Sequence, residues 1–311
     1  MYVRINSSVQ LAEYDDYNTL SKNPTISTST TTEADIDPDP LIPRKIWQIF
    51  FTERSSTGAL TDIDTEKLSD TASWLAKNPD YTYTLVGSNG GDDFVRRHFA
   101  DNWPILRTYR ALKNPGLKSD LLRYLILSVA GGTYTDTDTE AYRPIDEWVP
   151  AQYRNRTRVV VGIEFDRLDG PFWADIPHDL QFCQWTIAAA PGHPLFSSMA
   201  NRAVEALHEL VRVHNTTLPR LKASSIEVMN STGPAAWTDA VFEQLKLADP
   251  VGLTDLKNLS GITEPTLYGD ILVLPIDGFG MGQPHSMSTN DGSIPEQALM
   301  RHHFRGSWRD D

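Results

Sequence analysis

The sequence has almost no cysteine and an excess of negative charge, and both features exclude functions. Its 311 residues include one cysteine, Cys183, so an intrachain disulfide and a CxxC metal site are both excluded. Acidic residues outnumber basic ones by 41 to 28, and the net charge is −13. Nucleic-acid binding requires a basic stripe, and attachment to an anionic membrane requires a polybasic segment, so we expect neither. Cys183 lies in the apolar run FCQWTIAAA, which predicts a buried structural thiol.

Long hydrophobic runs are also missing. No segment reaches the roughly 18 apolar residues of a membrane span, and MYVRINSSVQLAEYDD at the start has no signal-peptide core. The sequence nevertheless contains five N-glycosylation sequons, which favour the secretory pathway; they begin at Asn6, Asn155, Asn215, Asn230 and Asn258. We therefore expect a protein of the secretory pathway whose anchor is absent from this sequence.

The composition changes near residue 40. The stretch STSTTTEADIDPDP is rich in Ser and Thr, then acidic and interrupted by proline, so we expect residues 1–40 to form a poorly ordered stem. Strand-like and helical patterns then alternate through residues 41–311. This alternation predicts one domain with an α/β fold, in which a mostly parallel central sheet is flanked by helices.

Individual elements follow from the same patterns. The predicted strands cover residues 45–51, 81–86, 133–138, 158–165, 184–190 and 270–275. The predicted helices cover residues 92–99, 118–130, 193–214 and 233–245, and a turn is predicted at 88–91. The clearest helix is KSDLLRYLILSVAGG, in which Ser119 is a natural N-cap and Gly131 a natural C-terminal residue.

Three acidic residues, Asp136, Asp138 and Glu140, occupy alternate positions in TYTDTDTEA directly after that helix. A strand would place them on one face, where they repel one another unless a cation lies among them. Four interpretations are open: a divalent-cation site, a phosphohydrolase pair, a calcium loop, or a solvated acidic face. Glu140 replaces the Thr or Val of phosphohydrolases, and Ala141 replaces the glycine of a calcium loop. The triplet lies at the C-terminal end of the predicted strand, which is where α/β sheets bind ligands.

Asp120 and Arg123 lie three residues apart near the start of the same apolar helix and therefore share a face. Two interpretations are open for this pair. It is either an intrahelical ion pair, or a polar clamp that reaches the ligand of the acidic triplet.

The block LKSDLLRYLILSVAGGTYTDTDTEAYRPI resembles the helix–Gly-Gly–DxD block of glycosyltransferase family 32. IPRKIWQIFF is similar to the N-terminal motif of that family. VVGIEFD, QFCQWTIAAAPGHPLF, STGPAAWTDAVF, VLPIDGFGMGQPHS and HHFRGSW resemble most closely the fungal initiation-specific α-1,6-mannosyltransferases of the Golgi. The resemblance covers residues 41–308. It implies a GT-A fold, GDP-mannose as donor, manganese as cofactor and a retained α linkage.

The resemblance also implies roles for individual residues. Asp136 would contact the donor ribose or sugar, and Asp138 would bind the metal together with His303. Asp120 and Arg123 would hold sugar hydroxyls and phosphate, so that Arg123, Asp136 and Asp138 form the catalytic group. The remaining donor contacts would come from Trp47, stacked on the base, and from Ser307 and Trp308, which would close over the diphosphate.

The acceptor side is less constrained by sequence. Glu164 and Asp166 either face the acceptor hydroxyl or are strand-end carboxylates in water, and His285 is either a ligand or a loop histidine. Adjacent residues of an extended chain point in opposite directions, so only one of His302 and His303 is expected to bind metal. Two tryptophans, Trp185 and Trp237, are expected in the core.

The function that this reading predicts is transfer of mannose from GDP-mannose to a mannose-rich glycan acceptor, by an α-1,6 linkage to the N-glycan core. The resemblance places the enzyme in the Golgi lumen as a type II membrane protein, within a mannosyltransferase complex. Alternatives are another donor sugar, a glycosphingolipid acceptor, a metal-dependent phosphohydrolase, and an inactive carbohydrate-binding relative.

Overall fold

The computed structural model describes residues 40–51, 68–173, 176–284 and 286–305. The predicted stem lies outside these ranges except for residue 40. Eight strands form the central sheet, in the order β2-β1-β3-β7-β5-β9-β8, with β6 paired to β5. They are β1 Lys45–Ile49, β2 Thr82–Val86, β3 Gly132–Thr135, β5 Val159–Asp166, β6 Leu180–Phe182, β7 Thr186–Ala189, β8 Thr266–Tyr268 and β9 Ile271–Leu274.

Most strands of the sheet run in one direction. β1 pairs in parallel with both β2 and β3, and β5 pairs in parallel with β9. β7 is antiparallel to both β3 and β5, so these two strands also share a direction. Within the main path only β7 and β8 run the opposite way. The prediction of a mostly parallel sheet is confirmed, and the carboxyl ends of β1, β3 and β5 meet at one edge.

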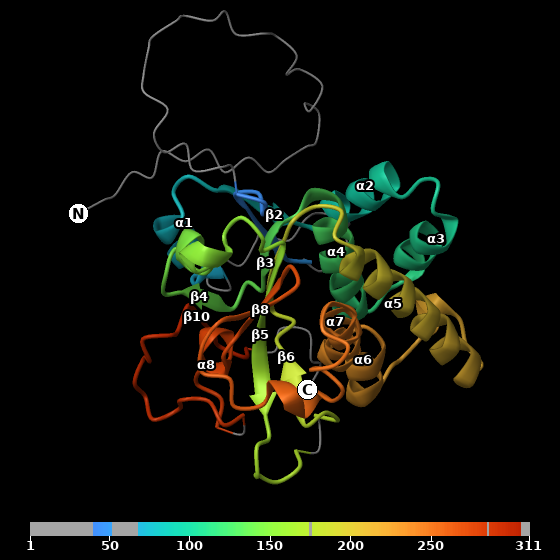
Figure 1. The fold of residues 1–311 in the computed structure, drawn as a ribbon. Helices are drawn as coiled ribbons and strands as arrows, with labels where there is room; N and C mark the ends of the chain where they lie inside the picture. Colours follow the sequence, from blue (N-terminus) through green and yellow to red (C-terminus); the bar gives the residue numbers. More distant parts are fainter. Residues whose placement is uncertain (1–39, 52–67, 174–175, 285, 306–311) are drawn as a thin grey trace, which may run out of the picture.

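Two layers cover the sheet (Figure 1). One face packs against α2 Ser88–His98, α3 Trp103–Ala111, α4 Pro115–Ala130, α5 Pro194–Val213, α6 Ser225–Ser231 and α7 Pro234–Ala248. The other face packs against α1 Thr71–Lys77, α8 Ile276–Phe279 and a small sheet of β4 Thr139–Ala141 and β10 Met300–His302. Neighbouring residues of a strand point to opposite faces of the sheet. Trp47 and Tyr134 therefore belong to the core on the first face, and Ile46 belongs to the core on the other face.

The helix before the acidic triplet starts earlier than predicted. α4 begins at Pro115, and the side chain of Asn114 caps it by accepting a hydrogen bond from the Leu117 amide at 3.0 Å, so Ser119 is not the N-cap. Proline at the first helical position requires no backbone donor, which explains the earlier start. The helix ends as predicted at Gly131, whose φ is +57°. A Cβ there would lie 2.7 Å from the Ala189 carbonyl oxygen, so glycine is required.

The helices predicted after residue 190 are confirmed, and the N-terminal strands are where the sequence places them. The turn predicted at residues 88–91 is wrong, because these residues form the first turn of α2. Gly91 faces the Tyr109 hydroxyl so closely that no side chain fits between α2 and α3. Within the described ranges, no helix is both long enough and apolar enough to cross a membrane.

Candidate active site

The acidic triplet does not lie on a continuous strand, contrary to the prediction. β3 ends at Thr135, the chain turns through Asp136 and Asp138, and β4 begins at Thr139. The Thr139 hydroxyl donates to the Asp136 carbonyl at 2.6 Å and lies 2.7 Å from the Thr135 hydroxyl. These bonds hold a tight turn at the carboxyl edge of the sheet and aim the two aspartates at a common point. Glu140 follows on β4 and faces elsewhere.

The C-terminal strand brings a histidine to this turn. β10 pairs antiparallel with β4, with His302 opposite Thr139, and the His303 amide donates to the Asp138 carbonyl at 2.9 Å. His302 Nε2 consequently lies 3.1 Å from Asp138 Oδ1. Its ring packs against Trp185, with the centroids 4.7 Å apart. The pairing of β4 with β10 thus joins two segments that are remote in sequence.

Asp136, Asp138 and His302 form the candidate metal centre. Each offers one ligand atom, and these atoms lie within 4.8 Å of one another. His302 Nδ1 is buried without a hydrogen-bond partner among the described residues. Two carboxylates and an imidazole are a donor set that manganese and related divalent cations accept, so the residues fit a metal.

The prediction of His303 as the metal ligand is not supported by the geometry. Its Nε2 atom lies 3.4 Å from Glu140 and 3.9 Å from Asp70, away from the two aspartates. Neighbouring residues of an extended strand point in opposite directions, as the sequence led us to expect, and the β10 register selects His302. His303 instead lies between Glu140 and Asp70, the residue before α1, and its Nε2 atom makes no hydrogen bond within the described residues.

Asp138 is ionised over the whole physiological range. Burial opposes its ionisation, but the hydrogen bond and the charge of His302, together with the Arg305 backbone amide at 2.9 Å, outweigh burial and lower its pKa to about 2. A carboxylate that remains charged is what a cation site requires.

The predicted clamp reaches the DxD turn. Arg123 Nη2 lies 3.0 Å from Asp120 Oδ1 and 3.5 Å from Asp136 Oδ1. Its Nη1 donates to the Gln184 carbonyl at 3.0 Å, and the guanidinium lies 4.6 Å from the centre of the Tyr134 ring. The intrahelical ion pair and the contact with the acidic turn therefore coexist in one buried arginine.

Two further residues complete the clamp, and sequence spacing did not identify them. The Thr232 hydroxyl donates to Asp120 Oδ2 at 2.8 Å, and the Gln184 side-chain amide donates to the Tyr124 hydroxyl at 2.6 Å and to the Thr232 carbonyl at 2.8 Å. Burial raises the pKa of Asp120 to about 6, although Arg123 and the Thr232 bond oppose the shift. The motif containing Thr232 was noted for its family resemblance, but nothing local links it to Asp120, 112 residues away.

Trp47 is not the exposed stacking residue that was predicted. It is central in β1, is 5% exposed, and packs in the core beside α4. Its indole Nε1 donates to the Gly131 carbonyl at 2.8 Å, which ties β1 to the helix terminus. The expected core positions of Trp185 and Trp237 are confirmed, as is the buried Cys183.

The two carboxylates of β5 are not in water, contrary to one of the two interpretations. Asp166 is 5% exposed and accepts hydrogen bonds from the Ser260 hydroxyl and the Gly261 amide at 2.8 and 2.7 Å. Glu164 is 8% exposed, and Gln181 Nε2 donates to it at 3.3 Å. Burial raises the pKa of Glu164 to about 8, against the opposing effect of the Gln181 bond.

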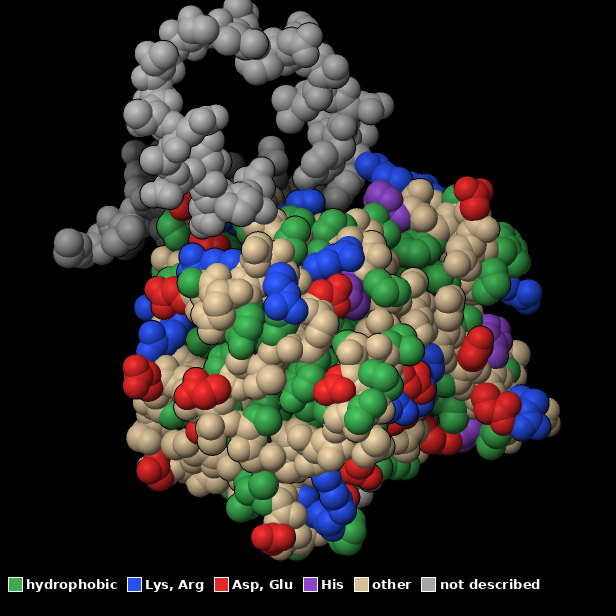
Figure 2. Space-filling view, viewed as in Figure 1, with side chains coloured by type: hydrophobic (Ala, Val, Ile, Leu, Met, Phe, Trp, Pro, Cys, Tyr) green, Lys and Arg blue, Asp and Glu red, His purple; other side chains and the backbone are tan. Residues whose placement is uncertain are grey.

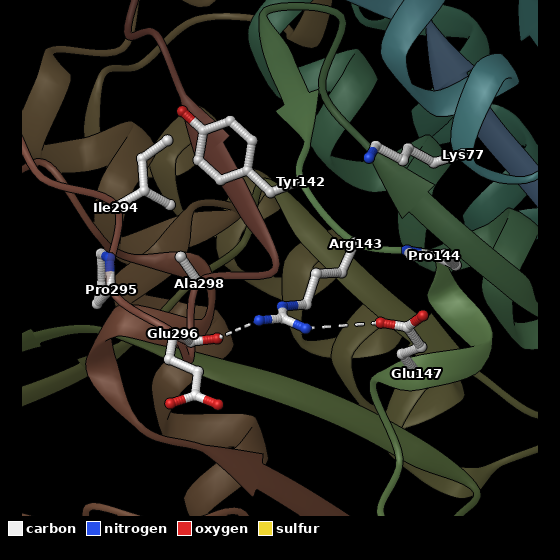
Figure 3. Close-up of a pocket in the computed structure, with 9 residues that line it drawn as sticks. All are labelled: Lys77, Tyr142, Arg143, Pro144, Glu147, Ile294, Pro295, Glu296 and Ala298. Carbon is white, nitrogen blue, oxygen red and sulfur yellow. Dashed lines mark hydrogen bonds and ion pairs between the residues drawn. The ribbon is translucent and has the colours of Figure 1, made fainter.

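Three predicted site residues, His285, Ser307 and Trp308, lie outside the described ranges. A separate pocket of about 610 Å³ lies between α1, the segment after β4, and residues 294–298 (Figure 3). Arg143 crosses it, donating to the Glu296 carbonyl at 2.9 Å and lying 3.8 Å from Glu147. None of its lining residues belongs to the metal centre or the clamp.

The DxD turn at the carboxyl edge of the sheet, beside a buried Arg–Asp clamp, can hold a divalent cation and an anionic ligand. A family model described as "Glycosyltransferase sugar-binding region containing DXD motif" matches residues 65–155. This range contains both α4 and the DxD turn. The chain is a glycosyltransferase.

Relatives narrow this class. An initiation-specific α-1,6-mannosyltransferase of Schizosaccharomyces pombe is 35% identical over 308 residues, covering 97% of this chain and 72% of the relative. The protein of the same name from Candida albicans is 35% identical, covering 76% and 66%. The chain belongs to the family of these enzymes, glycosyltransferase family 32, and its mixed sheet with flanking helices is the predicted GT-A fold. A solved PaToxG glycosyltransferase matches with a TM-score of 0.46 and 18% identity, covering 69% of this chain and 73% of its own.

Proposed function

We propose that the enzyme transfers mannose from GDP-mannose to a mannose-containing glycan, through an α-1,6 linkage and with retention at the anomeric carbon. The observation that carries this proposal is the convergence of Asp136, Asp138 and His302 beside Arg123 and Asp120. Family membership supports the sugar and the linkage, because the fungal relatives are named α-1,6-mannosyltransferases.

Manganese is the proposed cofactor, held by Asp136, Asp138 and His302. A bound divalent cation stabilises the negative charge that develops on a departing diphosphate. The protein has a net charge of −13, so an anionic donor needs a local source of positive charge. The cation and Arg123 would supply it.

The clamp residues are proposed to bind the donor sugar and phosphate. Arg123 is fixed on four sides, by Asp120, Asp136, the Gln184 carbonyl and the Tyr134 ring, so its orientation is set before the donor arrives. Its Nε–H is buried and has no partner among the described residues. Preorganised donors of this kind stabilise developing charge without reorganisation during the reaction.

Glu164 is proposed to face the acceptor hydroxyl. It lies near the end of β5, which shares its direction with β3, so both strands end at the same edge. A carboxyl group whose pKa lies near the working pH can exchange a proton with a hydroxyl group. Asp166 is assigned a different role, because its oxygens are already bonded to Ser260 and Gly261.

The proposed setting is the Golgi lumen, with a mannose-rich N-glycan as acceptor, within a mannosyltransferase complex. The experiment is a panel of nucleotide sugars with manganese, in which released nucleotide is measured with and without a high-mannose glycan, a mannoside or a glycosphingolipid. We expect the acceptor to stimulate release of nucleotide from GDP-mannose and from no other nucleotide sugar in the panel. Preference for another nucleotide sugar overturns the donor assignment, and stimulation only by the glycosphingolipid overturns the acceptor assignment.

A further inference from the structure

Three exposed hydrophobic residues have an unusual backbone conformation. Among the described residues, four non-glycine residues have positive φ, and three of them are Leu168, Met287 and Phe304, at 48°, 65° and 50°. These three side chains are 47%, 55% and 48% exposed. A left-handed backbone costs free energy for an L-residue, and exposure of a large apolar side chain gives no compensation. Residues held in rarely populated backbone conformations cluster at active sites and ligand-binding sites.

All three lie at the edge of the sheet that carries the active site. Phe304 is next to the metal centre, with its ring centroid 4.0 Å from that of His302. The registers of β3 with β7 and of β7 with β5 place the end of β3 level with Gly162. β5 continues for four more residues to Asp166, about 13 Å at 3.3 Å per residue, so the loop that begins at Arg167 extends beyond the DxD turn.

The base of that loop is firmly held. Asp166 accepts hydrogen bonds from the amides of Leu168 and Gly261 at 3.3 and 2.7 Å, and from the Ser260 hydroxyl at 2.8 Å. The Asp166 amide in turn donates to the Ser286 carbonyl at 3.2 Å. The buried aspartate therefore fixes the two loops that carry Leu168 and Met287 relative to each other.

An aromatic ring is held in the same place. The Arg167 guanidinium lies 4.0 Å from the centre of the Phe172 ring and forms an ion pair with Asp179 at 2.8 Å. Phe172 is nonetheless 79% exposed. A Cβ at Gly170 would lie 3.9 Å from the Met287 sulfur, so the two loops are in contact. In Figure 2, hydrophobic side chains lie beside acidic and basic ones at the lower tip, below the end of β5 in Figure 1.

We propose that Leu168, Phe172 and Met287 form an acceptor platform, which binds sugar residues of an oligosaccharide at a distance from the sugar that receives mannose. The proposal rests on the proposed function, and it adds that the enzyme recognises an extended acceptor. Because β5 extends about 13 Å beyond the level of the DxD turn, the platform would contact sugars remote from the one that receives mannose. Rigid aromatic and apolar groups bind at low entropic cost, because little order has to be gained.

A neutral glycan fits this surface better than a lipid membrane. The hexose ring has an apolar C–H face for Phe172 and hydroxyl groups for Arg167 and the exposed Asp169. The chain carries a net charge of −13, which opposes association with an anionic bilayer.

The test compares Phe172→Ala and Met287→Ala with wild type on two acceptors, a high-mannose oligosaccharide and a simple methyl mannoside. We expect each substitution to raise the ratio of the KM for the oligosaccharide to the KM for the mannoside about tenfold. This is the effect expected when one anchor residue of an interface is lost. Val251→Ala is the matched control. Val251 is 88% exposed and follows α7, whose end packs near Gly269 at the opposite edge of the sheet. It should leave both KM values unchanged.

Binding of the oligosaccharide without donor, measured by calorimetry, provides a second readout that needs no turnover. Phe172→Ala should weaken it about tenfold, and Phe172→Tyr, which keeps the ring, should restore it. Equal changes for both acceptors, or no change in either measurement, overturn the platform. The platform is also overturned if Phe172→Ala leaves glycan binding unchanged and instead weakens binding to neutral phosphatidylcholine vesicles. Failure of the wild type to transfer mannose overturns the proposed function instead, and the binding measurement still decides the platform.

Discussion

His302 Nε2 lies 3.1 Å from Asp138 Oδ1, although 164 residues separate them. This contact exists because β10 pairs with β4 directly after the DxD turn. Strand β10 is therefore part of the candidate metal centre, and its pairing with β4 holds His302 beside Asp138.

The first prediction distinguishes the two adjacent histidines. His302→Ala should raise the manganese concentration needed for half-maximal activity by at least about tenfold. Removal of a residue that only orients a metal ligand already lowers metal affinity by about this factor. His303→Ala serves as the matched control, because its ring contacts Glu140 and Asp70 instead. Activity is measured against manganese concentration for both. A metal requirement that rises in His303→Ala and stays normal in His302→Ala contradicts the assignment.

The second prediction concerns Asp138. Asp138→Asn should abolish transfer at any accessible manganese concentration, because a charged ligand is lost. It should also lower the free energy of unfolding by about 1–3 kcal/mol without metal, since Asp138 accepts hydrogen bonds from His302 and the Arg305 amide. In a thermal melt, manganese should stabilise the wild type and leave this variant unchanged. An active variant, or one that manganese still stabilises, shows that Asp138 is not a ligand.

The third prediction concerns Arg123, which is 6% exposed. Arg123→Lys keeps the charge but loses the planar fork that contacts Asp120, Asp136 and the Gln184 carbonyl. Each charge-assisted bond lost should cost about 1.5–3 kcal/mol of stability, and turnover should fall as well. Arg110→Lys, at an exposed position of α3, is the control. A variant that melts early but turns over normally at low temperature removes Arg123 from catalysis.

Much of the fold follows from local pattern. The apolar runs around Trp47 and Val160, and the amphipathic repeat of α5, each specify an element, because burial of one face leaves few alternatives. The reversed direction of β7 between β3 and β5 could not be derived in this way, because strand direction depends on connections that local pattern does not encode. The position of the DxD turn was also misjudged, because Thr135 to Thr139 alternate like a strand but bond to one another as a turn.

The site divides along the same line. Asp120, Arg123, Asp136 and Asp138 were identified because they are close in sequence and match a motif. Their partners Gln184, Thr232 and His302 lie 61, 112 and 164 residues from Arg123, Asp120 and Asp138, respectively, and reach them only through tertiary packing. The choice between His302 and His303 depended on which face of β10 meets the turn, and that follows from its register with β4.

The fourth prediction follows from the revised position of Trp47. Trp47→Ala should destabilise the fold by about 3–5 kcal/mol, as for other buried aromatic residues. Trp47→Phe keeps most of the packing but loses the bond to the Gly131 carbonyl, and should cost about 1 kcal/mol. Neither should change the affinity for GDP while the protein is folded. The measurements are urea unfolding and calorimetry with GDP, and weaker GDP binding by folded Trp47→Phe contradicts the core assignment.

The last prediction concerns pH and Glu164. Burial raises the pKa of this carboxyl group to about 8 from the ordinary value of 4.5, which applies in the unfolded chain. Between these values the folded state keeps a proton that the unfolded state releases, so the free energy of unfolding contributed by this group falls as pH rises. Glu164→Gln removes the titration. The melting temperature of Glu164→Gln should match that of the wild type near pH 4.5 and exceed it at pH 8. The free energy of unfolding at pH 8 should be about 1–3 kcal/mol higher than that of the wild type.

The control for this pH dependence is Glu205→Gln, at an exposed position of α5, which should not alter the slope of stability against pH. Because Glu164 is proposed to face the acceptor, the Glu164→Gln substitution should also reduce transfer to glycan more than it reduces hydrolysis of the donor in water. These two effects have separate causes and can fail separately. A wild-type stability that rises between pH 5 and pH 8 and is unaffected by Glu164→Gln contradicts the buried, protonated carboxyl group. Equal loss of transfer and hydrolysis contradicts its place on the acceptor side.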